Sequence, residues 1–140
     1  MLGLDSRNAT PENLLRSALE GATFALRFGI DELRHLGIDT GQIVLTGGGA
    51  NSPTWRQAVA DICNAPVVMH RQEEGAAFGA ALQALAVLDN AGDELPALVL
   101  AHLERDDSRS VEPQPTAVSF YDETYARYQR AVEQVTALYR

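Results

Sequence analysis

The fold is decided by the stretch Ile43-Val44-Leu45-Thr46-Gly47-Gly48-Gly49-Ala50-Asn51-Ser52-Pro53. Its first three residues are apolar and partly β-branched, which favours a short, buried parallel strand. Ser52 followed by Pro53 is a typical helix start, because the serine can cap the helix and the proline suits its first turn. The stretch therefore predicts a strand joined to a helix by a glycine-rich turn.

The flanking sequence continues this alternation of helices and strands. A first helix is predicted from Pro11 to Leu36, with Thr10 as its cap, Gly37 as its end and an apolar row at helical spacing: Leu15, Leu19, Ala22, Leu26 and Leu33. The helix after Ser52 ends at Asn64, with Trp55, Val59, Ile62 and Cys63 on its inner face. A second strand is predicted at 66–70 and a third helix from about Glu74 to Leu88. This order predicts an α/β fold with short parallel strands flanked by helices.

The C-terminal part is predicted to be helical. A break at 90–92 precedes a short helix over 93–103, and the charged segment 104–115 is interpreted as a loop. The last helix carries aromatic and apolar residues four and three positions apart, on one face: Tyr121, Tyr125, Tyr128, Val132, Val135 and Tyr139. We interpret this row as core. We divide the chain into 1–92 and 93–140, the second part being a helical extension of the same domain.

Composition excludes several classes of function. The net charge of −8, with no local concentration of Lys or Arg, argues against a nucleic-acid partner. No apolar run is long enough to cross a membrane and no signal-peptide layout is present, so we expect a cytoplasmic protein. Its one cysteine, Cys63, is interpreted as a buried core thiol. The three histidines lack metal-ligand spacing, so no protein metal site is predicted.

The glycine turn is the candidate ligand site. Gly47, Gly48 and Gly49 can expose backbone N–H groups to a phosphate or ribose, and the helix from Ser52 points the positive end of its dipole at the same place. A tight strand-to-helix turn without a ligand is the competing interpretation. No Gly-Lys-Ser/Thr follows, so the turn is not a P-loop, and the spacing does not match a dinucleotide fingerprint.

At this point the sequence resembles a known family. Thr46–Gln57, Ala60-Asp61-Ile62, Pro66-Val67-Val68 and Glu74–Ala81 together resemble the final signature of the FGGY carbohydrate kinases, most of all the xylulokinases, and Leu19–Arg27 resembles the helix that precedes it there. Trp55 and Asp61 match that pattern and are interpreted as structural residues, Asp61 as a buried or capping carboxylate.

The resemblance implies part of a ribonuclease-H-like domain of the actin-like ATPase fold, with residues 1–92 as its nucleotide-binding part. It implies ATP or ADP as ligand and Mg²⁺ carried by the nucleotide. Gly47, Gly48 and Gly49 would contact the phosphates and ribose, and Ala50, Asn51 and Ser52 would lie near the adenine.

The resemblance also implies a partner. In the family, the catalytic aspartate and an Asp-Gly-Thr-like phosphate loop belong to an N-terminal domain, and no Asp-x-Gly-Thr/Ser occurs in this sequence. We therefore expect this chain to be inactive alone and to need that N-terminal kinase domain. Two alternatives stay open: a non-catalytic interaction or oligomerisation module, and part of a kinase for another substrate such as glycerol or gluconate. We also expect self-association, through an unpaired sheet edge or the last helix.

Overall fold

The computed structural model describes residues 4–72, 75–88 and 94–139. The first helix, α1 (Pro11–His35), begins and ends as predicted: the Thr10 hydroxyl accepts a hydrogen bond from the backbone N–H of Asn13 at 3.3 Å, and Leu36 caps its other end. Gly37 then takes a positive φ of 78°, which a glycine adopts without steric cost.

The buried face of α1 differs from the predicted one. Thr23 and Phe24 are buried, whereas Leu15, Leu26 and Leu33 of the predicted apolar row are 74%, 48% and 41% exposed. Of the predicted row, Leu19 is partly buried and packs against the core, whereas these three leucines lie away from the face on which α2 and α5 pack.

The sheet is parallel, as predicted, but shorter. Strand β1 (Ile43–Val44) pairs with β2 (Val67–Val68) in parallel, with Ile43 opposite Val67 and Val44 opposite Val68. Both residues of β2 are buried, whereas Val44 is 44% exposed. The prediction of a buried first strand is therefore wrong for Val44, which lies on the sheet edge.

The segment 104–115 is more ordered than the predicted loop. Val111 exchanges two backbone hydrogen bonds of 2.9 Å with Val67, and Arg105 forms an antiparallel bridge with His70. This segment thus runs along the side of β2 that faces away from β1. The segment covers the β2 edge of the sheet, whereas the unpaired edge expected from the sequence is the one beside Ile43–Leu45.

Helix α2 (Pro53–Cys63) forms the centre of the core. Ser52 caps it, its hydroxyl accepting from the N–H of Trp55 at 3.3 Å, and Asn64 ends it in a left-handed conformation with φ of 46°. Val59, Ile62 and Cys63 are at most 1% exposed. Burial raises the pKa of the Cys63 thiol to about 11, so the interpretation as a core thiol is confirmed.

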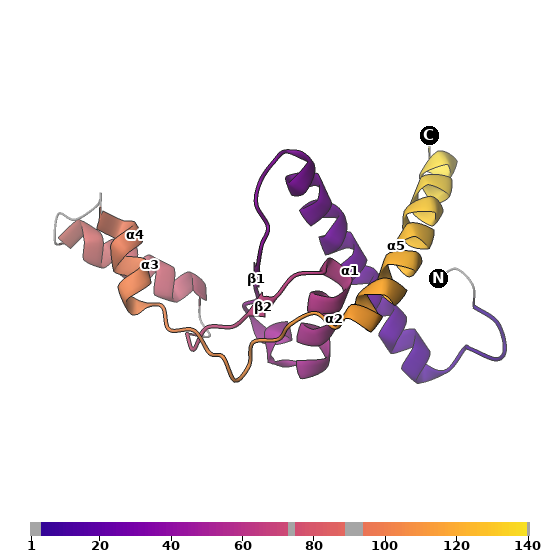
Figure 1. The fold of residues 1–140 in the computed structure, drawn as a ribbon, viewed down its shortest axis with the longest axis horizontal. Helices are drawn as coiled ribbons and strands as arrows, with labels where there is room; N and C mark the ends of the chain where they lie inside the picture. Colours follow the sequence, from indigo (N-terminus) through magenta and orange to yellow (C-terminus); the bar gives the residue numbers. More distant parts are fainter. Residues whose placement is uncertain (1–3, 73–74, 89–93, 140) are drawn as a thin grey trace.

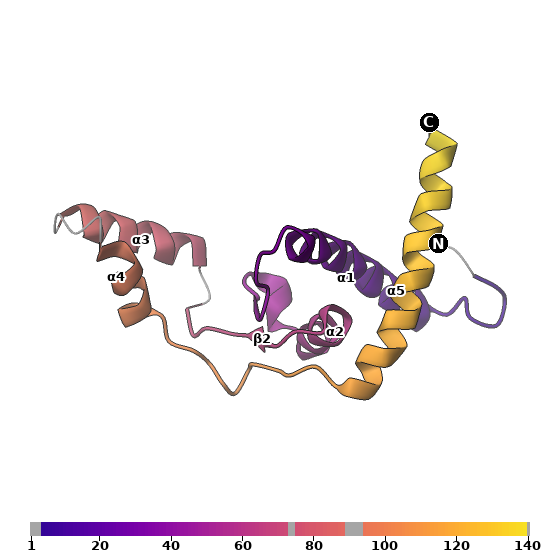
Figure 2. The same cartoon turned by 45° about the horizontal axis from the view of Figure 1, so that its top comes forward.

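Helix α5 (Pro115–Thr136) crosses α1 and α2 and closes the core (Figures 1 and 2). Tyr121 and Tyr125 are buried, and the Phe24 ring lies 6.2 Å, 5.7 Å and 5.4 Å from the rings of Tyr121, Tyr125 and Tyr128. The aromatic row is therefore core over its first half. Its second half is not, since Val132, Val135 and Tyr139 are at least 40% exposed.

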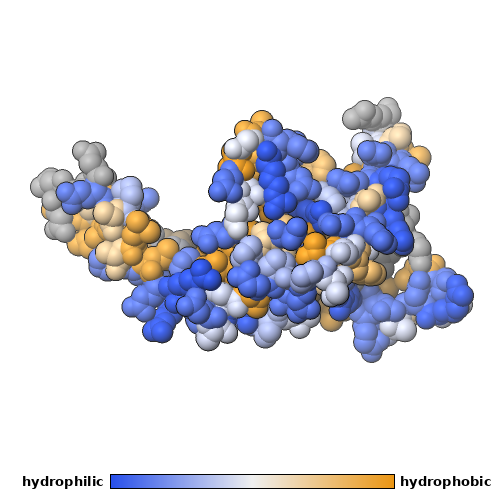
Figure 3. All heavy atoms as spheres, viewed as in Figure 1, coloured by the Kyte–Doolittle hydropathy of each residue, from blue (hydrophilic) through white to orange (hydrophobic). Residues whose placement is uncertain are grey.

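Two further helices project from this core. Helix α3 (Gly75–Leu88) packs against α4 (Leu95–His102), and the pair lies apart from α1, α2 and α5 in both views (Figures 1 and 2). Val87, Leu88 and Leu100 are more than 70% exposed, and Figure 3 shows apolar atoms over this part of the molecule. The predicted helix start at Glu74 and break at 90–92 fall outside the described residues.

Candidate functional site

The glycine turn lies at the carboxyl end of β1, directly before α2. Gly47 has φ of 81° and ψ of 178°, a conformation that is open essentially to glycine alone. A single 3₁₀ turn, η1 (Gly48–Asn51), then leads to Ser52. Backbone hydrogen bonds of 3.0 Å from Ala50 to Gly47 and from Ser52 to Gly49 close the turn. The turn is thus held by its own backbone.

The three glycines have three different surroundings. A Cβ on Gly49 would lie 2.4 Å from Cζ3 of Trp55, so this glycine allows the indole ring to pack against the backbone. A Cβ on Gly48 would meet no atom within 4 Å, and Gly48 has no positive φ. Gly48 thus borders open space without any backbone requirement for glycine.

The open space at Gly48 is part of a cavity of about 150 Å³. It is lined by residues that follow β1, by the glycine turn, by residues that follow β2 and by one residue of the 104–115 segment: Leu45, Thr46, Gly47, Gly48, Ala50, Asn51, Met69, Gln72 and Arg109. Ligand pockets for drug-sized molecules usually measure ~300–1,000 Å³. The cavity therefore has room for a phosphate or ribose group rather than a whole nucleotide.

The electrostatics of the turn favour an anion. Gly48 and Gly49 begin η1, so their backbone N–H groups precede its first intrahelical hydrogen bond, and the N-terminus of α2 adds partial positive charge. Behind the turn, the guanidinium of Arg56 is buried and donates to the Ala50 carbonyl at 2.7 Å. In the described residues no carboxylate pairs with Arg56, so its charge adds to the positive potential.

Four of the six predicted site residues, Gly47, Gly48, Ala50 and Asn51, line this cavity. The other two support it: Gly49 lies under Trp55 and Ser52 caps α2. Trp55 is half-buried, and its indole N–H donates to the Thr23 hydroxyl at 3.2 Å, so its structural role is confirmed.

Asp61 is confirmed as a buried carboxylate. It is 5% exposed and accepts hydrogen bonds from the backbone N–H of Gln114 at 2.8 Å and from the Gln57 amide at 2.9 Å. It thereby fixes the start of α5 to α2 from a distance of 53 residues along the chain. Its contacts are those of a structural group.

Sequence reasoning missed Met69, Gln72 and Arg109 as cavity residues. Arg109 donates from Nη2 to the Asn51 amide oxygen at 2.5 Å, across 58 residues. Gln72 donates to the His102 carbonyl at 2.9 Å and so ties the cavity wall to the end of α4. These residues reach the cavity because the 104–111 segment pairs antiparallel with β2 and the residues after it. No sequence pattern in that charged segment predicts the pairing.

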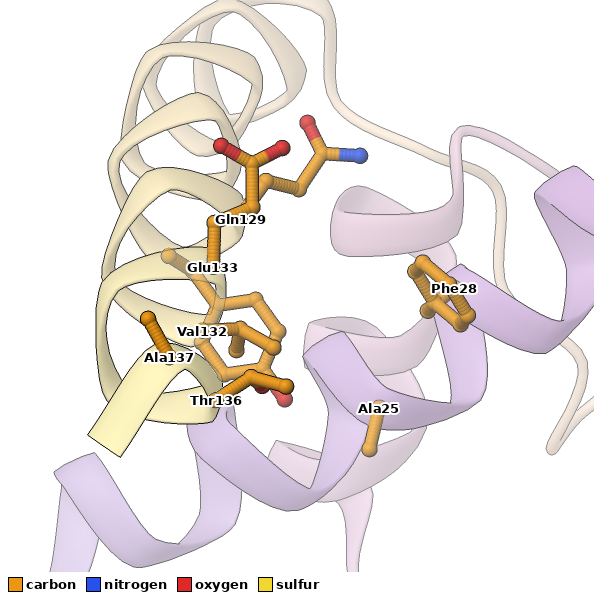
Figure 4. Close-up of a pocket in the computed structure, with 8 residues that line it drawn as sticks. Ala25, Phe28, Gln129, Val132, Glu133, Thr136 and Ala137 are labelled. Carbon is orange, nitrogen blue, oxygen red and sulfur yellow. The ribbon is translucent and has the colours of Figure 1, made fainter. Parts of the chain in front are cut away.

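A second cavity, of about 700 Å³, lies elsewhere, between α1 and the second half of α5 (Figure 4). Ala25 and Phe28 line its α1 side, and Val132, Thr136 and Ala137 line its α5 side. The lining is largely apolar and lacks paired titratable groups. The described residues also include no group of three or more His, Cys, Asp or Glu able to hold a metal ion, and no helix among them is long and apolar enough to span a bilayer.

Comparison with known proteins shows the family of this chain. Residues 1–88 match the model of the FGGY family of carbohydrate kinases, C-terminal domain. The chain belongs to the FGGY family. Its sequence is 44% identical, over 128 residues, to the xylulose kinase of Haemophilus influenzae, covering 91% of this chain and 26% of that protein. The chain therefore spans about a quarter of the length of the relatives that it matches.

Solved structures give the same assignment of the fold. A crystal structure of a xyloylose kinase from Brucella ovis superposes with a TM-score of 0.82 at 30% identity, over 98% of this chain and 28% of that one. The xylulose kinase from Rhodospirillum rubrum superposes with a TM-score of 0.79 over 97% of this chain and 27% of that one. The predicted fold, part of an actin-like ATPase domain with short parallel strands, is confirmed. The chain is similar to the C-terminal portion of FGGY xylulose kinases.

Proposed function

We propose that this chain provides the nucleotide-binding part of an ATP-dependent xylulose kinase of the FGGY family. The observation that carries the proposal is the open cavity at Gly47 and Gly48, where a glycine turn, the backbone N–H groups at the start of η1 and the start of α2 converge. Such a place suits phosphate groups, because the backbone can approach them closely. The similarity to xylulose kinases supports xylulose as the sugar.

In this proposal each site residue has a defined task. Gly47 and Gly48 hold the phosphates, and Gly49 serves by letting Trp55 support the turn. Ala50, Asn51 and Ser52 lie toward the nucleoside. Mg²⁺ binds through the nucleotide phosphates, since the described residues include no metal-binding cluster.

The proposal also assigns a division of labour. An N-terminal kinase domain provides the base that takes the sugar hydroxyl proton, together with most of the sugar pocket, and this chain positions the phosphoryl donor. Within this chain, residues 1–92 form the nucleotide-binding part and 93–140 a helical extension; the packing of α5 on α2 supports a single domain. Because ATP is the donor and Cys63 is an unpaired thiol, we assign the protein to the cytoplasm.

The test is calorimetric titration of the chain with ATP-Mg and ADP, repeated on Gly48→Leu. Leucine at this position fills the cavity without backbone strain, so the variant should fold normally and lose binding. Thr54→Leu is the control, because it adds a leucine at an exposed position in the first turn of α2. Binding that Gly48→Leu leaves intact would contradict a site at this turn. A coupled assay with xylulose should show no turnover by the chain alone.

The exposed apolar surfaces favour one second candidate, a role in association. Leu15 and Phe28 on α1 and Leu36 just after it are 74%, 51% and 77% exposed, and Phe28 lines the α1–α5 groove. Apolar surface that lines a groove is a typical place for an interaction. A chain that forms stable oligomers yet binds no nucleotide would favour the interaction module over the kinase part.

A further inference from the structure

We propose that Arg56 is a positioning residue of the nucleotide site, a role that rests on the proposed function. In this role its guanidinium holds the backbone of the glycine turn in the form that receives a polyphosphate, and the bound phosphates balance its positive charge. Arg56 lies within Thr46–Gln57, which carries the family resemblance, yet it is not one of the predicted site residues.

The geometry of α2 directs Arg56 toward the turn. Arg56 is the fourth residue of the helix, and its backbone N–H donates to the Ser52 carbonyl at 3.0 Å. Side chains of a helix lean toward its N-terminus, so this one extends back toward the turn that precedes α2. Its Nη1 donates to the Ala50 carbonyl at 2.7 Å, and the residue as a whole is only 8% exposed. The guanidinium thus reaches the turn from its buried side.

The contact with Ala50 fixes the turn at a residue that lines the cavity. Ala50 lies in η1, is 2% exposed and lines the cavity together with Gly47 and Gly48. Its N–H donates to the Gly47 carbonyl at 3.0 Å, while its carbonyl accepts from Arg56. Both sides of Ala50 are therefore held, and with them the orientation of the N–H groups at the start of η1. Such preorganisation spares a ligand the cost of ordering the turn.

The charge of Arg56 has no counter-charge within the described chain. None of the ion pairs among the described residues includes Arg56, and its Nε is buried without a hydrogen-bond partner among them. Burying a charge without a counter-charge is unfavourable. The N-terminus of α2 adds to this cost, because its partial positive charge disfavours a cation there. The folded chain thus keeps a cation where its own contacts do not balance it.

An anion in the neighbouring cavity offsets both costs. The phosphate groups of a nucleotide bring negative charge to the place where Arg56 and the start of α2 leave positive charge unbalanced. The protein as a whole has a net charge of −8 and repels such a ligand, so local positive charge is needed at the site. The ligand class is therefore a polyphosphate, which Arg56 attracts from behind the turn while the N–H groups of η1 contact it.

The competing interpretation is that Arg56 only stabilises the fold, by filling space and satisfying the Ala50 carbonyl. The two interpretations differ in the property that a neutral side chain of similar length changes. If Arg56 is only structural, Arg56→Met lowers the urea midpoint, and the folded variant binds triphosphate as well as wild type does. If Arg56 serves the site, the affinity falls but the midpoint changes little, because relief of the buried charge offsets the lost hydrogen bond.

The experiment is an NMR titration of the isotope-labelled chain with ATP-Mg and with inorganic triphosphate, combined with urea unfolding of the ligand-free chain. Arg56→Met removes the charge and the donors, Arg56→Gln keeps an amide donor without the charge, and Arg56→Lys keeps the charge. Arg105→Met is the matched control: Arg105 is exposed and pairs with Asp107 outside the cavity, so this substitution removes the same charge elsewhere. Gly48→Leu fills the cavity and tests the proposed function itself.

We expect Arg56→Met and Arg56→Gln to weaken both ligands by roughly 10-fold or more, the order expected when one unit charge acts across a partly buried site without direct contact. Arg56→Lys should recover part of the loss, and Arg105→Met should bind like wild type. The urea midpoint of Arg56→Met should stay close to that of wild type.

Each other outcome overturns a definite statement. Wild-type affinity in folded Arg56→Met, with binding lost in Gly48→Leu, would leave Arg56 a structural residue and the proposed function standing. Equal losses with Arg56→Met and Arg105→Met would show an effect of net charge alone. A folded wild-type chain that binds neither ligand would overturn both proposals. Circular dichroism shows whether Arg56→Met is folded; if it is not, Arg56→Gln and Arg56→Lys decide, and equal affinities of these two variants would overturn the role of the charge.

Discussion

Substituting the three glycines one at a time separates the backbone, packing and ligand requirements of the turn. Gly49→Ala places a Cβ 2.4 Å and 2.8 Å from two ring carbons of Trp55, closer than real Cβ contacts come. Trp55 cannot move away freely, because its indole N–H donates to the Thr23 hydroxyl and its backbone N–H donates to the Ser52 hydroxyl. Overpacking of this kind costs about 1–3 kcal/mol.

The neighbouring glycines give different values. Gly48→Ala meets no atom within 4 Å and needs no positive φ, so we expect unchanged stability or a gain of about 0.4–1 kcal/mol from the stiffer unfolded chain. Gly47→Ala also finds open space, but its φ of 81° with ψ of 178° costs about 1–3 kcal/mol for a residue with a Cβ. The predicted order of stability is therefore Gly48→Ala highest, with the other two well below wild type.

Urea unfolding followed by far-UV circular dichroism measures these differences, since a shift of the midpoint at constant slope reports stability alone. The double variant Gly49→Ala with Trp55→Leu tests the cause. Once the indole is gone, adding the methyl group should cost less than about 0.5 kcal/mol, and the difference appears as a coupling energy. Equal losses at Gly48 and Gly49, or no rescue by Trp55→Leu, would refute the packing argument.

Three further predictions concern the core and the surface. Phe24→Ala removes a buried ring that contacts three tyrosines and should cost about 3–5 kcal/mol in urea unfolding; a loss below about 1 kcal/mol would show that the aromatic cluster is not the core. Burial raises the pKa of Cys63 from 9.0 to about 11, so between these pH values the thiol ionises in the unfolded chain but not in the folded one, and the free energy of unfolding should fall as pH rises. Cys63→Ala should reduce this fall, and a pH profile unchanged by the substitution would contradict the prediction. Sedimentation equilibrium should show species heavier than 15.1 kDa, reduced by Phe28→Glu in the α1–α5 groove and unaffected by Arg105→Ala; a clean monomer at high concentration would exclude self-association.

Local chemistry explains why most element boundaries could be predicted. Thr10 and Ser52 cap their helices, and Gly37 and Asn64 end them with positive φ, all through contacts within a few residues. Such contacts depend on the sequence alone, since capping groups bond to backbone one turn away. The same holds for Gly47, where the turn requires a conformation that only glycine takes easily.

Features that depend on distant partners could not be predicted. The α1 periodicity fits two faces, and only the position of α2 and α5 decides that Phe24 is buried and Leu26 is not. The pairing of Val111 with Val67 depends on backbone groups, which carry no sequence pattern. Arg109 follows from that pairing, so a motif search confined to the glycine turn finds Gly48 and misses the charge beside it.

The size of the cavity at Gly48 sets an expectation for affinity. At about 150 Å³ it encloses a phosphate or ribose group, so most of a bound ATP molecule would remain outside it in this chain. Binding should then be weak, on the order of 1 mM or about −4 kcal/mol, and inorganic triphosphate should bind nearly as well as ATP. If ATP instead binds far more tightly than triphosphate, this chain alone must enclose the nucleoside, and the division of the nucleotide site between two domains would be wrong.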